Sequence, residues 1–169
     1  MKISIIGNIA SGKTTLAKIL EQKYKIKPTH IDTLQYNQDL SIKPFNETIQ
    51  ILKQVQNAES WIIDGYGPLD ILEERFKLSD QIIFIDFSIW QNYFWLIKRQ
   101  LKNLIHPRLE LPAGSSEISW VHTKKLFKTI QQIHFKMHPE LRRILYREIN
   151  LNKLIHIKTA EELMVYQKG

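Results

Sequence analysis

Hydrophobic residues recur along the chain in two patterns. Short, nearly continuous apolar runs predict buried strands, and longer runs with apolar residues every three or four positions predict amphipathic helices. The expected strands are Lys2–Ile6, Pro28–Ile31, the run Trp61-Ile62-Ile63 that ends at Asp64-Gly65, Gln81–Phe87 and Leu154–Ile157. The expected helices are Lys13–Tyr24, Pro44–Asn57, Asp70–Phe76, Ser88–Ile105, Ile118–Lys136, Pro139–Ile149 and Ala160–Gln167, with Pro139 breaking two of them apart.

Strands that alternate with helices predict an α/β fold. The apolar strands indicate a five-stranded parallel sheet with helices on both faces, in one domain spanning residues 1–169. The least periodic stretch is 106–119, which carries two prolines, Gly114 and paired serines. We expect it to be a lid or a surface connection in a helical lid region.

The longest expected helix, Ser88–Ile105, carries a strong apolar stripe. Its members recur at helical spacing and are Trp90, Phe94, Ile97, Leu101 and Leu104. Stacking of these aromatic residues and Trp95 on a base is one interpretation. Packing of the stripe against the core is the favoured prediction.

The segment between the first strand and the first helix carries the most specific chemical signal. Residues 7–14 match the phosphate-binding P-loop, G-x-x-x-x-G-K-S/T, in its strand–loop–helix setting. We expect backbone amides of the loop and the helix N-terminus to bind a nucleoside triphosphate, with Lys13 on the outer phosphates and the Thr14 hydroxyl on Mg²⁺. The predicted nucleotide-binding residues are Gly7, Asn8, Ala10, Ser11, Gly12, Lys13, Thr14 and Thr15.

Three acids follow the expected strands, where ligands gather in open α/β sheets. Asp64 is the candidate second metal ligand beside Thr14, with a turn-forming role before Gly65 as the alternative. Asp32 is a candidate to orient an acceptor hydroxyl, accept its proton or share the metal, with a helix or turn cap as the alternative. Asp32, Asp64 and Tyr66 are the candidates to contact the acceptor. Asp86 leads directly into a helix, so capping of that helix is favoured for it.

Basic residues are concentrated in one part of the chain. Eleven Lys and Arg residues face three acids between residues 98 and 147, a local charge of +8 in a chain of net charge +7. Phosphoryl transfer needs cations beyond the loop lysine, and Arg99 and Arg143 are the preferred catalytic candidates. The same charges also suit a nucleic-acid backbone.

Composition narrows the setting. The chain has no cysteine, which excludes disulfides and thiol chemistry and fits a cytoplasmic location. No apolar run approaches the length of a membrane span, and the six histidines do not form a metal-binding cluster by spacing.

Taken together, the motifs resemble a known group. After the P-loop come His30-Ile31-Asp32-Thr33-Leu34, residues 61–66 (WIIDGY), residues 80–86 (DQIIFID) and a long helix with Lys98-Arg99. This is similar to the adenylate-kinase-related P-loop proteins labelled DNA topology modulation protein (FlaR-like). Adenylate kinases continue their Asp-Gly element with Phe-Pro-Arg, whereas this chain has Tyr66-Gly67-Pro68. The resemblance implies a nucleoside-kinase-like, Mg²⁺-dependent phosphotransferase fold in which Ser11 and the other loop residues line the triphosphate.

Two functions follow as expectations. The first is an ATP- and Mg²⁺-dependent kinase that transfers the γ-phosphate to a nucleotide or small-molecule acceptor. The second is an ATP-binding or ATP-hydrolysing protein that contacts nucleic acid through its basic half. A GTPase is disfavoured, because the guanine-reading element Asn-Lys-x-Asp is missing and Asn152-Lys153 is followed by Leu154-Ile155.

Overall fold

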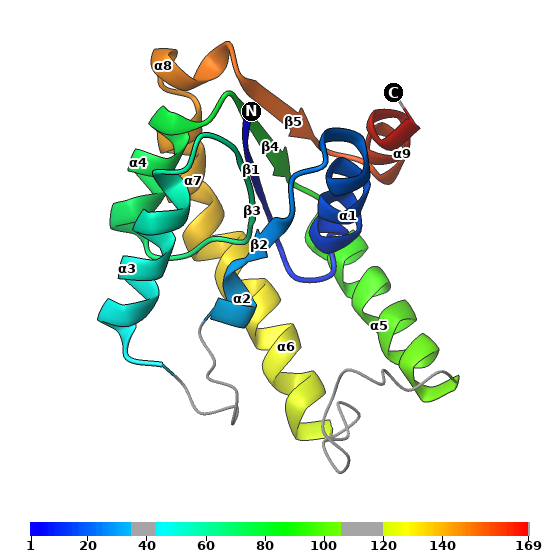
Figure 1. Ribbon diagram of the computed structural model, residues 1–169. Helices are drawn as coiled ribbons and strands as arrows, with labels where there is room; N and C mark the ends of the chain where they lie inside the picture. Colours follow the sequence, from blue (N-terminus) through cyan, green and yellow to red (C-terminus); the bar gives the residue numbers. More distant parts are fainter. Residues whose placement is uncertain (35–42, 106–119, 169) are drawn as a thin grey trace.

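Figure 1 shows the computed structural model, which describes residues 1–34, 43–105 and 120–168. Its centre is a sheet of five strands in the order β2-β3-β1-β4-β5, with every neighbouring pair parallel. The strands are β1 (Lys2–Gly7), β2 (Pro28–His30), β3 (Trp61–Asp64), β4 (Gln81–Ile85) and β5 (Leu154–Ile157). The predicted α/β architecture is therefore confirmed.

Helices cover both faces of the sheet. In Figure 1, α1 (Lys13–Tyr24) and α9 (Ala160–Lys168) lie on one face, whereas α3 (Phe45–Gln56), α4 (Leu69–Leu78) and α7 (His138–Leu145) lie on the other. The remaining helices are α2 (Ile31–Leu34), α5 (Ile89–Ile105), α6 (Trp120–Gln132), the π-helical turn η1 (Ile133–Met137) and α8 (Glu148–Leu151). None of the described helices is long and apolar enough to cross a membrane.

The core lies on the two faces of the central strands. Successive side chains of a strand point to opposite faces. In β4, Ile83 and Ile85 therefore join one cluster, with α1 and α9, while Ile82 and Phe84 join another, with α4 and α7. This burial on both faces explains why the strand sequences are continuously apolar rather than alternating.

The strand order brings the chemical motifs to one edge of the sheet. β1 lies between β3 and β4, so the P-loop that follows β1 starts between the carboxyl ends of its two neighbours. Gly7 is in register with Ile85, and His30 at the end of β2 is in register with Asp64 at the end of β3. These pairings place the P-loop, His30 and Asp64 at the carboxyl edge of the sheet, where ligands bind in open α/β folds.

The expected break at Pro139 is wrong. Helix α6, turn η1 and helix α7 follow one another without a gap from residue 120 to 145. The backbone N–H of His138 bonds to the carbonyl of Ile133, five residues back. A proline inside a helix lacks a donor and clashes with a carbonyl four residues back. The wider π turn directly before Pro139 accommodates the ring without ending the helix.

The predicted burial of the apolar stripe on α5 is also wrong. Its four members within the described side chains are exposed: Trp90 at 77%, Phe94 at 61%, Ile97 at 48% and Leu101 at 55%. Periodicity shows which residues share a helix face, but another element must cover that face to bury it. The expected lid at 106–119 lies outside the described residues.

Candidate functional site

The loop from Gly7 to Lys13 has a backbone that its two glycines permit. A side chain on Gly7 would place Cβ 2.6 Å from the carbonyl oxygen of Ile85 and 2.9 Å from Ser11 Oγ, so only glycine fits there. Gly12 has φ +89°, in the left-handed region that glycine adopts without strain. Ala10 adopts φ +59°, a conformation that is uncommon for a residue with a side chain. Such strain clusters at ligand-binding loops.

Asn8 anchors the loop to helix α6. Its side chain is fully buried, and its Nδ2 donates to the carbonyl of Ile130 in α6 at 3.0 Å. Its Oδ1 accepts from the amide of Ile9 at 2.7 Å. The side chain of Asn8 is therefore engaged within the protein. If Asn8 binds a phosphate as predicted, it would do so through its backbone amide.

Lys13 and Ser11 carry the polar groups that suit an anion. Lys13 Nζ donates to the carbonyl of Asn8 at 2.8 Å, and burial lowers the pKa of this amine although Asp64 and Asp32 oppose the shift. Ser11 Oγ is buried without a hydrogen-bond partner among the described residues. A buried hydroxyl without a partner costs free energy. Polyphosphate oxygens at this position would satisfy it.

The two predicted metal ligands meet at the base of the loop. Thr14 Oγ1 donates to Asp64 Oδ2 at 3.1 Å, and Asp64 is 5% exposed. Its second oxygen, Oδ1, is buried and has no hydrogen-bond partner in the part of the chain that is described. A hydroxyl and a carboxylate oxygen are the ligand types that Mg²⁺ takes beside phosphate oxygens and water. Nowhere within the described ranges are three His, Cys, Asp or Glu residues grouped to hold a metal, so a site here would have one carboxylate and one hydroxyl as its protein ligands.

Two residues that sequence analysis missed support Asp64. His30 Nδ1 lies 3.0 Å from Asp64 Oδ2, and this hydrogen bond raises the pKa of His30 above its ordinary 6.5. Arg75 is 1% exposed, and its Nη2 donates to the carbonyl of Gly65 at 2.9 Å. Burial lowers the pKa of Arg75 to about 9, which the charge of Asp64 partly opposes. The pairing of β2 with β3 places His30 beside Asp64, so a correct alignment of these strands could have predicted this contact. No pattern in the sequence around Arg75 indicates its contact with Gly65.

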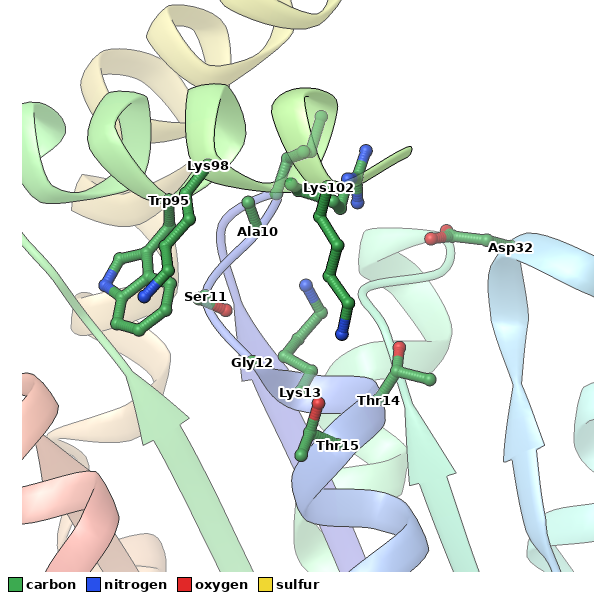
Figure 2. A pocket seen from close by; sticks show the side chains of 12 residues that line it. Ala10, Ser11, Gly12, Lys13, Thr14, Thr15, Asp32, Trp95, Lys98 and Lys102 are labelled. Carbon is green, nitrogen blue, oxygen red and sulfur yellow. The ribbon is translucent and has the colours of Figure 1, made fainter. Parts of the chain in front are cut away.

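A cavity of about 470 Å³ opens above the P-loop (Figure 2). Residues 9–15 form one wall, and α5 forms the opposite wall with Trp95, Lys98, Arg99 and Lys102. In Figure 2, the side chains of Lys13 and Lys102 extend into the space between these walls, and Asp32 faces it from α2, the short helix after β2. The structure thus places the predicted residue Arg99 beside the P-loop, together with two lysines on the same helix.

A second cavity of about 860 Å³ adjoins the first. The two share Ile9, Lys13 and Asp32 in their linings, so the P-loop lysine faces both. Tyr66 lines the second cavity; its buried hydroxyl has no partner among the described residues, and burial raises its pKa. The lining also includes Lys43, Phe45, Thr48 and Lys125. Asp32 and Tyr66 therefore line the same cavity, and their role in binding an acceptor stays a prediction.

Arg143 lies away from both cavities in this structure. Its side chain is 77% exposed on α7 and pairs with Glu140 at 3.2 Å. The cavity linings contain neither Arg143 nor its neighbour Arg142. A catalytic role for Arg143 stays a prediction that would require movement of α7 or of its side chain.

Asp86 is not the helix cap that we expected. Its carboxylate is 5% exposed and accepts hydrogen bonds from His138 at 2.9 Å, from Arg142 at 2.8 and 3.1 Å, and from His156 at 3.0 Å. Burial alone would raise the pKa of Asp86, but the hydrogen bonds from His138 and Arg142 outweigh it and hold this pKa well below its usual range. The hydroxyl of Ser88 instead accepts from the first turn of α5.

Comparisons with known proteins agree with the fold. No protein-family model matches the sequence, and no curated protein is significantly similar to it. Among solved structures, the chain is similar to shikimate kinase from Acinetobacter baumannii in complex with shikimate. The TM-score is 0.56 with 12% sequence identity, over 99% of this chain and 89% of that chain. The chain has this P-loop kinase fold. Membership of the FlaR-like family stays a prediction.

Proposed function

We propose that the protein is an ATP- and Mg²⁺-dependent phosphotransferase that acts on a small acceptor. The observation that carries this proposal is the pair of adjoining cavities that share Lys13 and Asp32. A hydrolase needs room for a phosphate chain and a water molecule. The second cavity, about 860 Å³ in volume, offers space for a second substrate next to the transferring phosphate.

The residues of the first cavity suit a nucleoside triphosphate. The loop amides and Lys13 would hold the phosphates, and Arg99 and Lys102 face them across the cavity. Thr14 and Asp64 would hold Mg²⁺, which supplies neutralisation of the outer phosphate charge when bound. Trp95 offers an aromatic face at the same cavity, suited to a nucleotide base.

The residues of the second cavity suit an acceptor that carries a hydroxyl and a negative charge. Asp32 could orient the hydroxyl and accept its proton, since it lies where the two cavities join. Lys43 and Lys125 add positive charge to the lining, which Tyr66 also joins. In-line transfer from ATP would then pass beside Lys13, which stabilises charge on the moving phosphoryl group.

An acceptor screen tests this proposal. Purified protein with ATP and Mg²⁺ is offered a panel of hydroxylated acids, nucleosides and nucleoside monophosphates, and ADP formation is measured. We expect at least one acceptor to raise turnover, and Lys13→Ala to lower that turnover by roughly 100-fold or more. Lys18→Ala is the matched control, since Lys18 is an exposed residue of the same helix outside the cavity linings. Acceptor-independent ATP hydrolysis that duplex DNA stimulates would contradict the proposal.

A further inference from the structure

Helix α5 leaves four large apolar side chains on its surface. Among its described side chains, the most buried are Asn92 and Leu96 at 0% exposure and Gln100 at 9%. The large apolar side chains Trp90, Phe94, Ile97 and Leu101 are instead 48–77% exposed. A contiguous exposed apolar face of this kind marks an interaction surface. We name these four residues the α5 stripe.

The spacing of the α5 stripe indicates the shape of its partner. Trp90, Phe94, Ile97 and Leu101 follow one another at intervals of four, three and four residues. This is the spacing of the seam of a left-handed coiled coil, where apolar residues of one helix insert between those of a second helix. The partner that fits the α5 stripe is therefore another helix.

The α5 stripe is complementary to itself in the antiparallel direction. When a second copy is placed antiparallel about a twofold axis midway between residues 95 and 96, Trp90 faces Leu101 of the other copy and Phe94 faces its Ile97. Each large aromatic side chain then meets a smaller aliphatic one, as close packing favours. A parallel pair would set Trp90 against Trp90 and leave the large residues at one end.

The charges of α5 favour the same arrangement. The helix has no charged residue from Ile89 to Ile97, and its basic residues within the described side chains are Lys98, Arg99 and Lys102. In the antiparallel pair these cations face the uncharged first half of the second copy, so like charges stay apart. A parallel pair would bring the two basic ends together.

We propose that two copies of this chain associate through an antiparallel pair of α5 helices. The α5 stripes of two copies would together cover on the order of 1,000 Å², which is the size of a weak, reversible interface. Trp95, Lys98, Arg99 and Lys102 line the P-loop cavity from other positions of the same helix. Dimer formation would therefore restrict the movement of α5, the helix that forms the outer wall of this cavity. The proposal does not depend on the identity of the reaction.

Cysteine cross-linking tests the geometry, because the chain has no cysteine of its own. A mixture of Phe94→Cys and Ile97→Cys proteins should form a disulfide-linked dimer on mild oxidation, since these positions face each other. Trp90→Cys alone should remain unlinked, because the two Trp90 positions lie about 16 Å apart along an antiparallel pair and disulfides need Cα atoms within about 7 Å. Efficient Trp90→Cys self-linking would indicate a parallel pair and overturn the proposal.

Sedimentation analysis tests the association itself. We expect the unmodified protein to dimerise reversibly with a Kd of roughly 10 µM to 1 mM. Phe94→Glu should raise that Kd at least tenfold, since it places a charge in the seam. Val165→Glu is the matched control, because Val165 is a similarly exposed apolar residue, at 72%, on another helix, α9. A protein that stays monomeric up to millimolar concentration, with no Phe94–Ile97 cross-link, would refute the proposal.

Discussion

Two aspartates lie at the carboxyl ends of the strands on either side of β1 and have different chemistry. Asp64 ends β3 and Asp86 directly follows β4, and both carboxylates are 5% exposed. Asp86 has hydrogen bonds to both oxygens, from three side chains that carry or can carry positive charge. Asp64 has its hydrogen bonds with Thr14 and His30 on one oxygen and leaves the other without a partner among the described residues.

This difference separates a structural carboxylate from a candidate ligand-binding one. Asp86 joins β4 to α7 and β5 through His138, Arg142 and His156. The negative charge of Asp86 is therefore paired within the protein. Asp64 lies under the P-loop with one oxygen bonded to a hydroxyl and the other without a partner in the described part of the chain, which is an incomplete coordination site rather than a complete network. We infer that the two roles are distinguished by how many of the carboxylate oxygens have hydrogen-bond partners, more than by burial or position.

The largest effect should come from removing the structural aspartate. Asp86→Ala leaves the half-exposed Arg142 and two largely buried histidines without their shared acceptor, and leaving buried polar groups unpaired costs about 1–3 kcal/mol. Chemical denaturation should show this loss, whereas Glu140→Ala should change the free energy of unfolding by less than about 1 kcal/mol, because that pair is exposed.

The same variant offers a way to break the comparison. Asp86→Ala protein that is still folded at low temperature should bind ATP with Mg²⁺ as the unmodified protein does. Because the pKa of Asp86 is depressed in the folded protein, the stability that its charge provides is fully present above the ordinary pKa of 3.8. This stability is lost as the pH falls toward the lower folded-state pKa. Loss of nucleotide binding without loss of the fold would place Asp86 in the site and contradict its structural role.

The smallest effect concerns the proton on His30. The hydrogen bond to Asp64 raises the pKa of His30, so the stabilisation from this pair is fully present below the ordinary value of 6.5 and is lost as pH rises through the raised folded value. Histidine proton chemical shifts followed against pH should show this pKa, with His30→Gln to assign the signal. In Asp64→Asn the pKa should fall back toward 6.5. An unchanged pKa would show that Asp64 is not the partner.

The sequence could predict features that depend on neighbouring residues. The P-loop is one contiguous segment with fixed spacing, and its helix Lys13–Tyr24 has the predicted bounds. Asp64 was found because it ends a clearly apolar strand. The partners of Asp86 lie 52–70 residues away, so a local pattern suggested only a helix cap. The pattern of α5 likewise identified a shared face but contained no information on what covers it.

Calorimetry of ATP binding with and without Mg²⁺, on the unmodified protein and on Asp64→Asn, tests the central claim most directly. The account predicts that the unmodified protein binds ATP and that Mg²⁺ strengthens this binding. Asp64→Asn should lose roughly 10–100-fold of the metal-dependent part and keep its metal-free affinity. Absence of ATP binding by the unmodified protein, or a Mg²⁺ effect of the same size in both proteins, would contradict the assignment of this carboxylate to a metal-nucleotide site.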